Sequence, residues 1–153
     1  MPASASALDL DTAARLRASI GRLSRRLRPT AAGAAAGLTP TRISVLFTIA
    51  RLGPIRLSEL ADEEGLNPTM LSRVISDFAD AELVKRACDP DDRRAALVQI
   101  TAAGRKLCAR MRAERTDVLE VALAGLDEDE RRAVEQALPV LEQLAHGLKG
   151  RRG

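Results

Sequence analysis

The sequence predicts a mainly α-helical fold with one small β-hairpin, and three observations carry that prediction. A short apolar helix opens at Leu57 and ends at Gly65. Asn67-Pro68 then starts a second helix, because asparagine can accept a free backbone N–H and proline needs no donor at the first helical position. Two β-prone runs flank the Asp- and Pro-rich segment 89–94, as in a hairpin. Helix, turn, helix and hairpin in this order predict a winged helix-turn-helix core at about 54–101.

The N-terminal part of the chain is predicted to form a helix after a short tail. Residues 1–8 are small and polar, and we expect them to be disordered. Asp9 or Asp11 can cap a helix over about 9–28, whose apolar residues recur at spacings of four, three and four and suit packing against another helix. Its arginines form either a solvated basic face or a contact to phosphate. The apolar residues are Leu16, Ile20, Leu23 and Leu27, and the arginines are Arg15, Arg17, Arg22, Arg25, Arg26 and Arg28.

A second helix is expected before the core. Thr39 can cap it and Pro40 suits its first turn, and the helix runs through Leu52. We expect the alanine-rich stretch from Pro29 to Gly37 to be a loop. The expected buried stripe of the helix is Ile43, Leu46, Phe47 and Ala50.

Two helices are expected after the hairpin, over about 102–148. Thr101 can cap the first, and Asp127 with Glu130 forms a capping box for the second. Pro139 should bend that last helix or remove one of its hydrogen bonds. The apolar seams of these terminal helices have no evident partner within one chain, which indicates packing against a second subunit.

The second helix of the core has two faces. Leu71, Val74, Ile75 and Phe78 recur at i, i+3, i+4 and i+7, which predicts one buried stripe. The opposite face is small and polar with one arginine, Arg73, and suits insertion into a major groove. Alternatively, Arg73 pairs with Asp77 one turn later. The candidate DNA-contacting residues on this helix are Asn67, Thr69, Met70, Ser72, Arg73 and Ser76; Asn67 would hold a phosphate or act only as a cap.

Charge is unevenly distributed along the chain. The pI is about 9.4, but residues 1–53 carry a net charge of +6, residues 54–101 carry −4 and residues 102–153 carry +1. Global charge therefore does not support nucleic-acid binding by the core. Only local placement of its basic residues on one face can do so.

The residues of the core resemble the MarR family of bacterial transcription regulators. The resemblance covers nearly the whole chain, as a single MarR-type domain over 9–153. It rests on Leu60-Ala61, on Asn67-Pro68-Thr69 with Arg73, on Asp89-x-x-Asp92-x-Arg94, and on Leu97-x-x-Ile100-Thr101-x-x-Gly104.

The resemblance implies a homodimer that binds an inverted-repeat operator on double-stranded DNA. Such a regulator is usually a repressor, released by an oxidant or by a small phenolic or lipophilic effector. Dimerisation would use helices 9–28 and 102–148. A winged-helix protein-interaction module with weak or lost DNA binding is the alternative, since the core is acidic.

The hairpin is the wing of the fold. By resemblance, its tip would enter the minor groove. By resemblance Arg94 is the projecting residue, with Arg93 as the alternative. Arg86 is a further candidate DNA contact, because it could share one face with the other basic residues of the core. Asp92 is assigned to brace the tip by accepting a guanidinium across the turn, with Asp89 as the alternative. Two features depart from the family pattern. Glu82 stands where a glycine usually ends the helix, and Asp91 adds a third carboxylate to the tip.

Other classes of function lack support in the sequence. His146 is the only histidine, and no nucleophile has a paired base, so we expect neither an enzyme nor a metal site or cofactor. Cys88 is either a redox-sensing thiol or a small strand residue, and Cys108 is expected in the core or an interface. We expect a cytoplasmic protein, because no apolar run is long enough for a membrane span and no signal peptide is evident.

Overall fold

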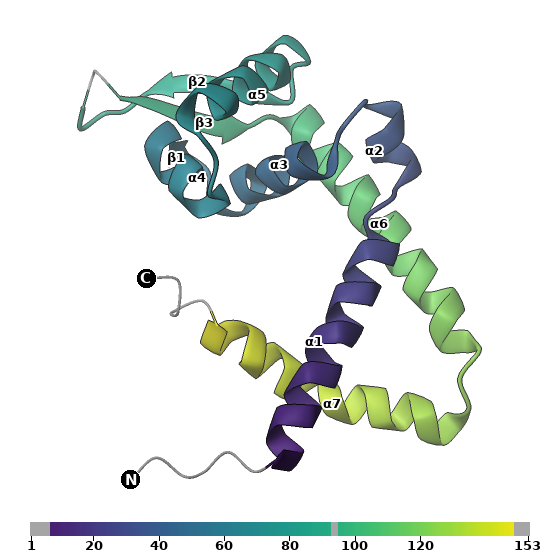
Figure 1. Cartoon of the computed structure of the whole chain (residues 1–153). Helices are drawn as coiled ribbons and strands as arrows, with labels where there is room; N and C mark the ends of the chain where they lie inside the picture. Colours follow the sequence, from purple (N-terminus) through teal and green to yellow (C-terminus); the bar gives the residue numbers. More distant parts are fainter. Residues whose placement is uncertain (1–6, 93–94, 149–153) are drawn as a thin grey trace, which may run out of the picture. The chain divides into compact units, whose positions relative to one another are not determined.

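The computed structural model describes residues 7–92 and 95–148 (Figure 1). The chain divides into two compact units, Met1–Arg115 and Thr116–Gly153. Of the tail predicted to be disordered, only residues 7 and 8 are described, and they begin the first helix. In the described residues, every helix is too short or too polar to cross a membrane.

The first unit has the predicted helix-turn-helix and hairpin, and a short strand that was not predicted, β1, adds to the hairpin to form a small antiparallel sheet. Its strand order is β1-β3-β2, and β2 and β3 form the wing, with Arg86 opposite Val98. The elements are α1 (Ala7–Leu27), α2 (Ala31–Ala35), α3 (Pro40–Leu52), β1 (Ile55–Arg56), α4 (Leu57–Glu64), α5 (Pro68–Asp80), β2 (Val84–Cys88), β3 (Ala96–Ile100) and the first part of α6 (Ala102–Ala124).

The helix caps of the core are those the sequence predicted. Gly65 ends α4 in the left-handed conformation, with φ 62°. The side chain of Asn67 caps α5, and the Thr101 hydroxyl accepts the Gly104 N–H at 3.0 Å at the start of α6. These local signals fix where α4 ends and where α5 and α6 begin.

The core of the first unit is aliphatic, with one phenylalanine. Ile43 and Leu46 of α3 are buried as expected, but Phe47 and Ala50 are only partly buried. Val45, Thr48 and Ile49 are buried in addition, so α3 is covered over a wider arc than the predicted stripe. The largest fully buried side chains are Phe78, Leu46, Ile49, Leu60, Leu71, Ile75 and Met111.

The predicted loop between Pro29 and Gly37 is wrong over part of its length, because α2 forms there. The Thr30 hydroxyl caps α2 by accepting the Gly33 N–H at 3.1 Å. Both carboxylate oxygens of Glu114, on α6, accept the Ala32 N–H at 3.1 and 3.2 Å. The helix therefore depends on an acceptor 82 residues away, which no local pattern reveals.

The second unit comprises the end of α6 and α7 (Glu128–Gly147). The predicted capping box is present: Asp127 accepts the Glu130 N–H at 2.8 Å, and Glu130 accepts the Asp127 N–H at 3.0 Å. Helix α7 runs through Pro139 and has no buried residue. Its large apolar side chains are exposed: Val134, Leu138, Val140, Leu141 and Leu144. Leu148, which follows the helix, is exposed too.

Glu82 adopts the left-handed backbone that its position demands, with φ 57°. A side chain in this region costs roughly 1–2 kcal/mol. Replacing Glu82 with glycine removes that strain but adds unfolded-state entropy, so we expect a net gain of about 0.5–1 kcal/mol in the free energy of unfolding. Urea denaturation followed by circular dichroism measures it. Glu82→Ala keeps the strain and serves as the matched control, and an equal gain in both variants would contradict this account.

Candidate nucleic-acid interface

Helix α5 presents the polar face that its periodicity predicted. Leu71, Val74, Ile75 and Phe78 are buried, whereas Thr69, Met70, Arg73 and Ser76 are exposed and Ser72 is half-buried. The Asn67 Oδ1 atom accepts the Thr69 N–H at 2.8 Å, so the capping role of Asn67 is confirmed. A phosphate contact at the same helix end remains a prediction.

The expected alternative for Arg73, an ion pair with Asp77, does not form. Asp77 instead pairs with Arg42, in the first turn of α3. Within the described residues, Arg73 makes no hydrogen bond or ion pair. Its guanidinium is therefore available for a contact that the described residues do not supply.

The wing touches α5 through a polar contact. Arg86, on β2, donates to the Ser76 hydroxyl at 3.2 Å, and both residues are exposed. These two predicted DNA contacts thus lie side by side. Arg93 and Arg94 lie outside the described residues, so the identity of the projecting residue remains a prediction.

Asp89, which directly follows β2 at the start of the wing tip, is fixed by a partner that the sequence did not suggest. Its buried carboxylate accepts the Nε and Nη2 groups of Arg56, each at 2.6 Å. It also accepts the Asp91 N–H at 2.9 Å. This backbone hydrogen bond, followed by Arg56, holds the pKa of Asp89 below its ordinary value, against the opposing effect of burial.

This ion pair joins the wing to the helix-turn-helix, because Arg56 belongs to β1 and directly precedes α4. Asp89 therefore connects two elements through Arg56, which is a different contact from the predicted brace across the tip. The brace assigned to Asp92, toward Arg93 or Arg94, stays a prediction because both arginines lie outside the described residues.

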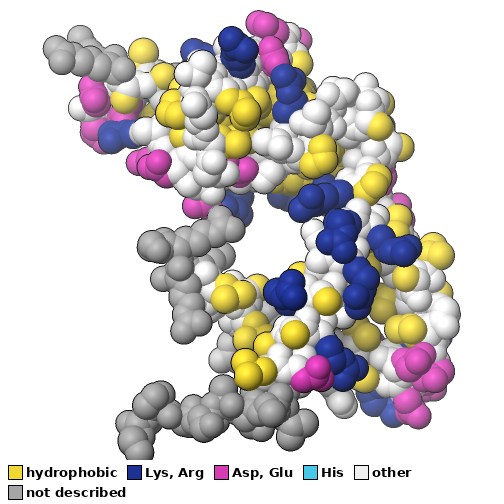
Figure 2. Space-filling view, viewed as in Figure 1, with side chains coloured by type: hydrophobic (Ala, Val, Ile, Leu, Met, Phe, Trp, Pro, Cys, Tyr) yellow, Lys and Arg dark blue, Asp and Glu magenta, His cyan; other side chains and the backbone are white. Residues whose placement is uncertain are grey.

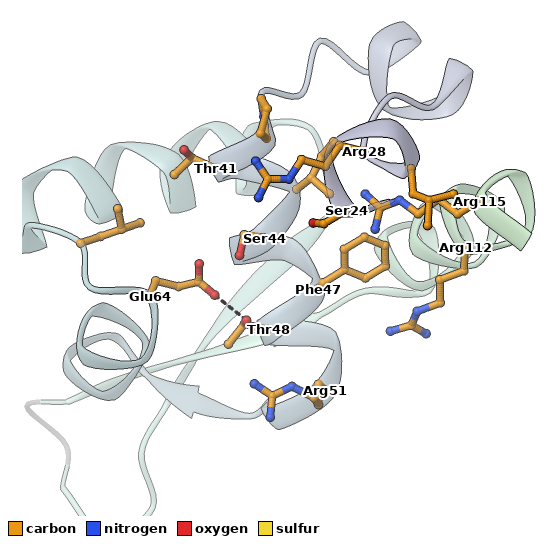
Figure 3. A pocket seen from close by; sticks show the side chains of 14 residues that line it. Ser24, Arg28, Thr41, Ser44, Phe47, Thr48, Arg51, Glu64, Arg112 and Arg115 are labelled. Carbon is orange, nitrogen blue, oxygen red and sulfur yellow. Dashed lines mark hydrogen bonds between the residues drawn. The ribbon is translucent and has the colours of Figure 1, made fainter. Parts of the chain in front are cut away.

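A second polar feature is a pocket of about 790 Å³ lined by α1, α3, α6 and the end of α4 (Figure 3). Its charged lining consists of Arg28, Arg51, Arg112, Arg115 and Glu64. The guanidinium carbons of Arg112 and Arg115 each lie 5.0 Å from the centre of the Phe47 ring. The Arg115 Nε is buried and has no hydrogen-bond partner within the described residues. Figure 3 shows Glu64 turned toward Thr48, which donates a hydrogen bond to it.

Comparison with known proteins agrees with this geometry. The family model described as MarR family matches residues 38–96, which hold α3, the helix-turn-helix and most of the wing. An uncharacterized HTH-type transcriptional regulator of Mycobacterium bovis is 33% identical over 136 residues, covering 86% of this chain and 94% of that protein. The chain belongs to the MarR family. It is a transcriptional regulator with a DNA-binding winged-helix fold, and not an enzyme.

Solved structures share the MarR fold. A putative transcriptional regulator of Pseudomonas aeruginosa is 30% identical, with a TM-score of 0.77, covering 92% of this chain and 97% of that one. The MepR F27L mutant of S. aureus was solved bound to an oligodeoxyribonucleotide. It is 15% identical, with a TM-score of 0.64, and the match covers 87% of this chain and 97% of that one. At that identity the likeness concerns the fold alone.

The two cysteines of this MarR-family chain lie in different surroundings. Cys88 is exposed on β2, and Cys108 is buried, as expected for a core residue. Burial raises the pKa of the Cys108 thiol, although Arg112 partly opposes the shift, so the thiol is poorly reactive. The described residues contain no group of three or more His, Cys, Asp or Glu side chains that could hold a metal ion.

Proposed function

We propose that this regulator is a homodimer that binds an inverted-repeat operator and releases it when a small organic anion occupies the arginine-lined pocket. The observation that carries the DNA-binding part is the exposed polar face of α5, where Arg73 has no partner among the described residues. Such an arginine can donate two hydrogen bonds to the O6 and N7 atoms of guanine in the major groove. The MepR mutant, which has the same fold, was solved bound to an oligodeoxyribonucleotide.

The acidic character of the core does not oppose DNA binding as strongly as its net charge suggests. Three of its acids are paired with arginines: Glu63 with Arg51, Asp77 with Arg42, and Asp89 with Arg56. Two of these arginines come from α3, outside the 54–101 segment that carries the −4 charge. This pairing favours DNA binding over the alternative of a protein-interaction module.

Exposed apolar surface supports the proposed dimer. Leu10, Ile20 and Leu23 of α1 are 66%, 53% and 54% exposed. In the other unit, Val121 is 76% exposed and α7 buries none of its residues. Arginines gather over α1 (Figure 2), whereas the first turn of α7 holds Glu128, Asp129 and Glu130. We infer that a second copy covers the apolar rows of each unit.

A direct test uses fluorescence anisotropy with the protein's own promoter region and a scrambled duplex, and sedimentation for the mass. We expect two protomers per operator and half-sites about 10 bp apart. Arg73→Ala should weaken operator binding by about 1–3 kcal/mol and reduce the preference over scrambled DNA. Thr69→Ala is the milder comparison variant. A monomer, or an unchanged preference in Arg73→Ala, would contradict the proposal.

The pocket favours an anionic effector with an aromatic or other apolar body. Arg28 and Arg115 line it beside Phe47, and the Arg115 Nε has no hydrogen-bond partner within the described residues, so an organic carboxylate would find both pairing and stacking partners. An organic carboxylate is a more specific class of effector than the phenolic or lipophilic molecule that the resemblance implied. Glu64 ends α4, so a ligand that displaces it would act directly on the helix-turn-helix.

Matched probes test the effector class. Benzoate should raise the melting temperature and lower operator affinity, whereas benzamide, which has the same shape without the charge, should do neither. A benzoate concentration of 100 times Kd should raise the free energy of unfolding by about 2.7 kcal/mol. Arg28→Gln should reduce the response to benzoate. Equal responses to both probes would refute an anion site, and responses to neither would refute a benzoate-type effector.

A further inference from the structure

A contact beside the recognition helix deepens the proposed role of Arg73. Arg42 is the third residue of α3, and its Nη2 group pairs with the Oδ2 atom of Asp77 on α5. Their side chains are 32% and 49% exposed, so the pair lies at the surface. Two hollows of about 630 Å³ flank it, and Arg42, Thr69 and Arg73 line both. The ion pair and Arg73 thus share one surface.

Asp77 has two cations within its reach. Arg73 lies four residues earlier on the same helix, a spacing at which opposite charges meet. Arg42 lies 35 residues earlier in the sequence and reaches Asp77 from α3. The carboxylate takes Arg42. The geometry therefore leaves Arg73 without a partner among the described residues, on the face that is proposed to read DNA.

We propose that Arg42 is a positioning residue for DNA recognition: by holding Asp77, it keeps Arg73 free for a base. The inference rests on the proposed function, because it assumes that Arg73 reads a base. Without Arg42, Asp77 would pair with Arg73 and compete with guanine for the same guanidinium. Arg42 also neutralises a carboxylate that would otherwise repel nearby phosphates.

The size of the expected effect follows from the Arg73–Asp77 ion pair that would replace the Arg42–Asp77 pair. An exposed ion pair contributes at most about 1 kcal/mol, which equals a factor of about five in an equilibrium constant. Freeing Asp77 should therefore lower the preference for operator over scrambled DNA by up to about fivefold. Loss of a direct phosphate contact by Arg42 would instead weaken both duplexes equally, since phosphate contacts carry no sequence information.

The test compares variants by their operator-to-scrambled affinity ratio at one salt concentration. Arg42→Gln should lower the ratio about threefold to fivefold. Asp77→Asn should keep the wild-type ratio, because no carboxylate remains to capture Arg73. The double variant Arg42→Gln/Asp77→Asn should recover the ratio of Asp77→Asn, and Arg42→Lys, which preserves the ion pair, should stay near wild type. Melting curves of all variants control for the fold.

Three results decide whether Arg42 positions Arg73. Rescue of the ratio in the double variant supports the positioning role. An unchanged ratio in Arg42→Gln, or a double variant no better than Arg42→Gln, overturns it while leaving the base contact of Arg73 intact. If Arg73→Ala itself leaves the ratio unchanged, the proposed function fails and the inference fails with it.

Discussion

Replacing Gly104 with alanine should destabilise the protein by about 3 kcal/mol, near the upper end of the usual cost of overpacking. A Cβ atom at this position would lie 2.2 Å from the Leu83 carbonyl oxygen and 2.8 Å from Cγ1 of Ile100. The carbonyl cannot move freely, because it also accepts the Thr101 N–H at 3.0 Å. Alanine would therefore push the start of α6 away from the segment that leads into β2.

The sign of the effect makes this prediction decisive. By helix propensity alone, alanine should be about 1 kcal/mol better than glycine inside a helix. Gly21→Ala on α1 is the matched control, because its Cβ would meet only the end of the Arg25 side chain, at 3.5 Å. Urea unfolding should show a loss for Gly104→Ala and no comparable loss for Gly21→Ala. A gain for Gly104→Ala would mean that α6 does not approach Leu83 this closely.

The elements that the sequence predicted correctly carry their signals locally. The Asn67-Pro68 start of α5, the end of α4 at Gly65 and the capping box at Asp127 each involve a few neighbouring residues. The period of apolar residues was equally informative, since it separated the buried stripe of α5 from the face that exposes Arg73. Helix α5 and the wing could therefore be placed from the amino-acid sequence alone.

The features that the sequence did not reveal depend on residues far apart in the chain. Helix α2 relies on Glu114, and β1 is a two-residue strand that exists only by pairing with β3. Asp89 pairs with Arg56, which is 33 residues away in the sequence. Asp77 pairs with Arg42, which is 35 residues away. Arg42 and Arg56 were unremarkable in sequence, since a lone arginine near a helix end usually marks a solvated position. Tertiary packing alone assigns them a role.

Replacing Asp89 with alanine should weaken operator binding by at least about tenfold, equivalent to losing one hydrogen bond to a charged group at the DNA. Asp89 would not touch DNA; it fixes the wing by holding Arg56 and the Asp91 N–H. A charge argument forecasts the opposite sign, because removing a carboxylate near phosphates should tighten binding. Operator affinity at two salt concentrations separates the two, and tighter binding by Asp89→Ala would rule out the brace.

Asp89→Asn isolates the ion pair from the turn, because its amide oxygen can still accept the Asp91 N–H but carries no charge for Arg56. The lowered pKa of Asp89 gives this comparison a pH dependence. A carboxyl whose folded pKa is depressed adds stability above its unfolded pKa of about 3.9 and loses it as pH falls through the lower folded pKa. Wild type should therefore melt at a higher temperature than Asp89→Asn at pH 6, and the gap should shrink from about pH 4 downward. A gap that stays constant from pH 6 to pH 3 would show that the charge on Asp89 does not hold the wing, and the effect on DNA affinity would then have to come from the turn alone.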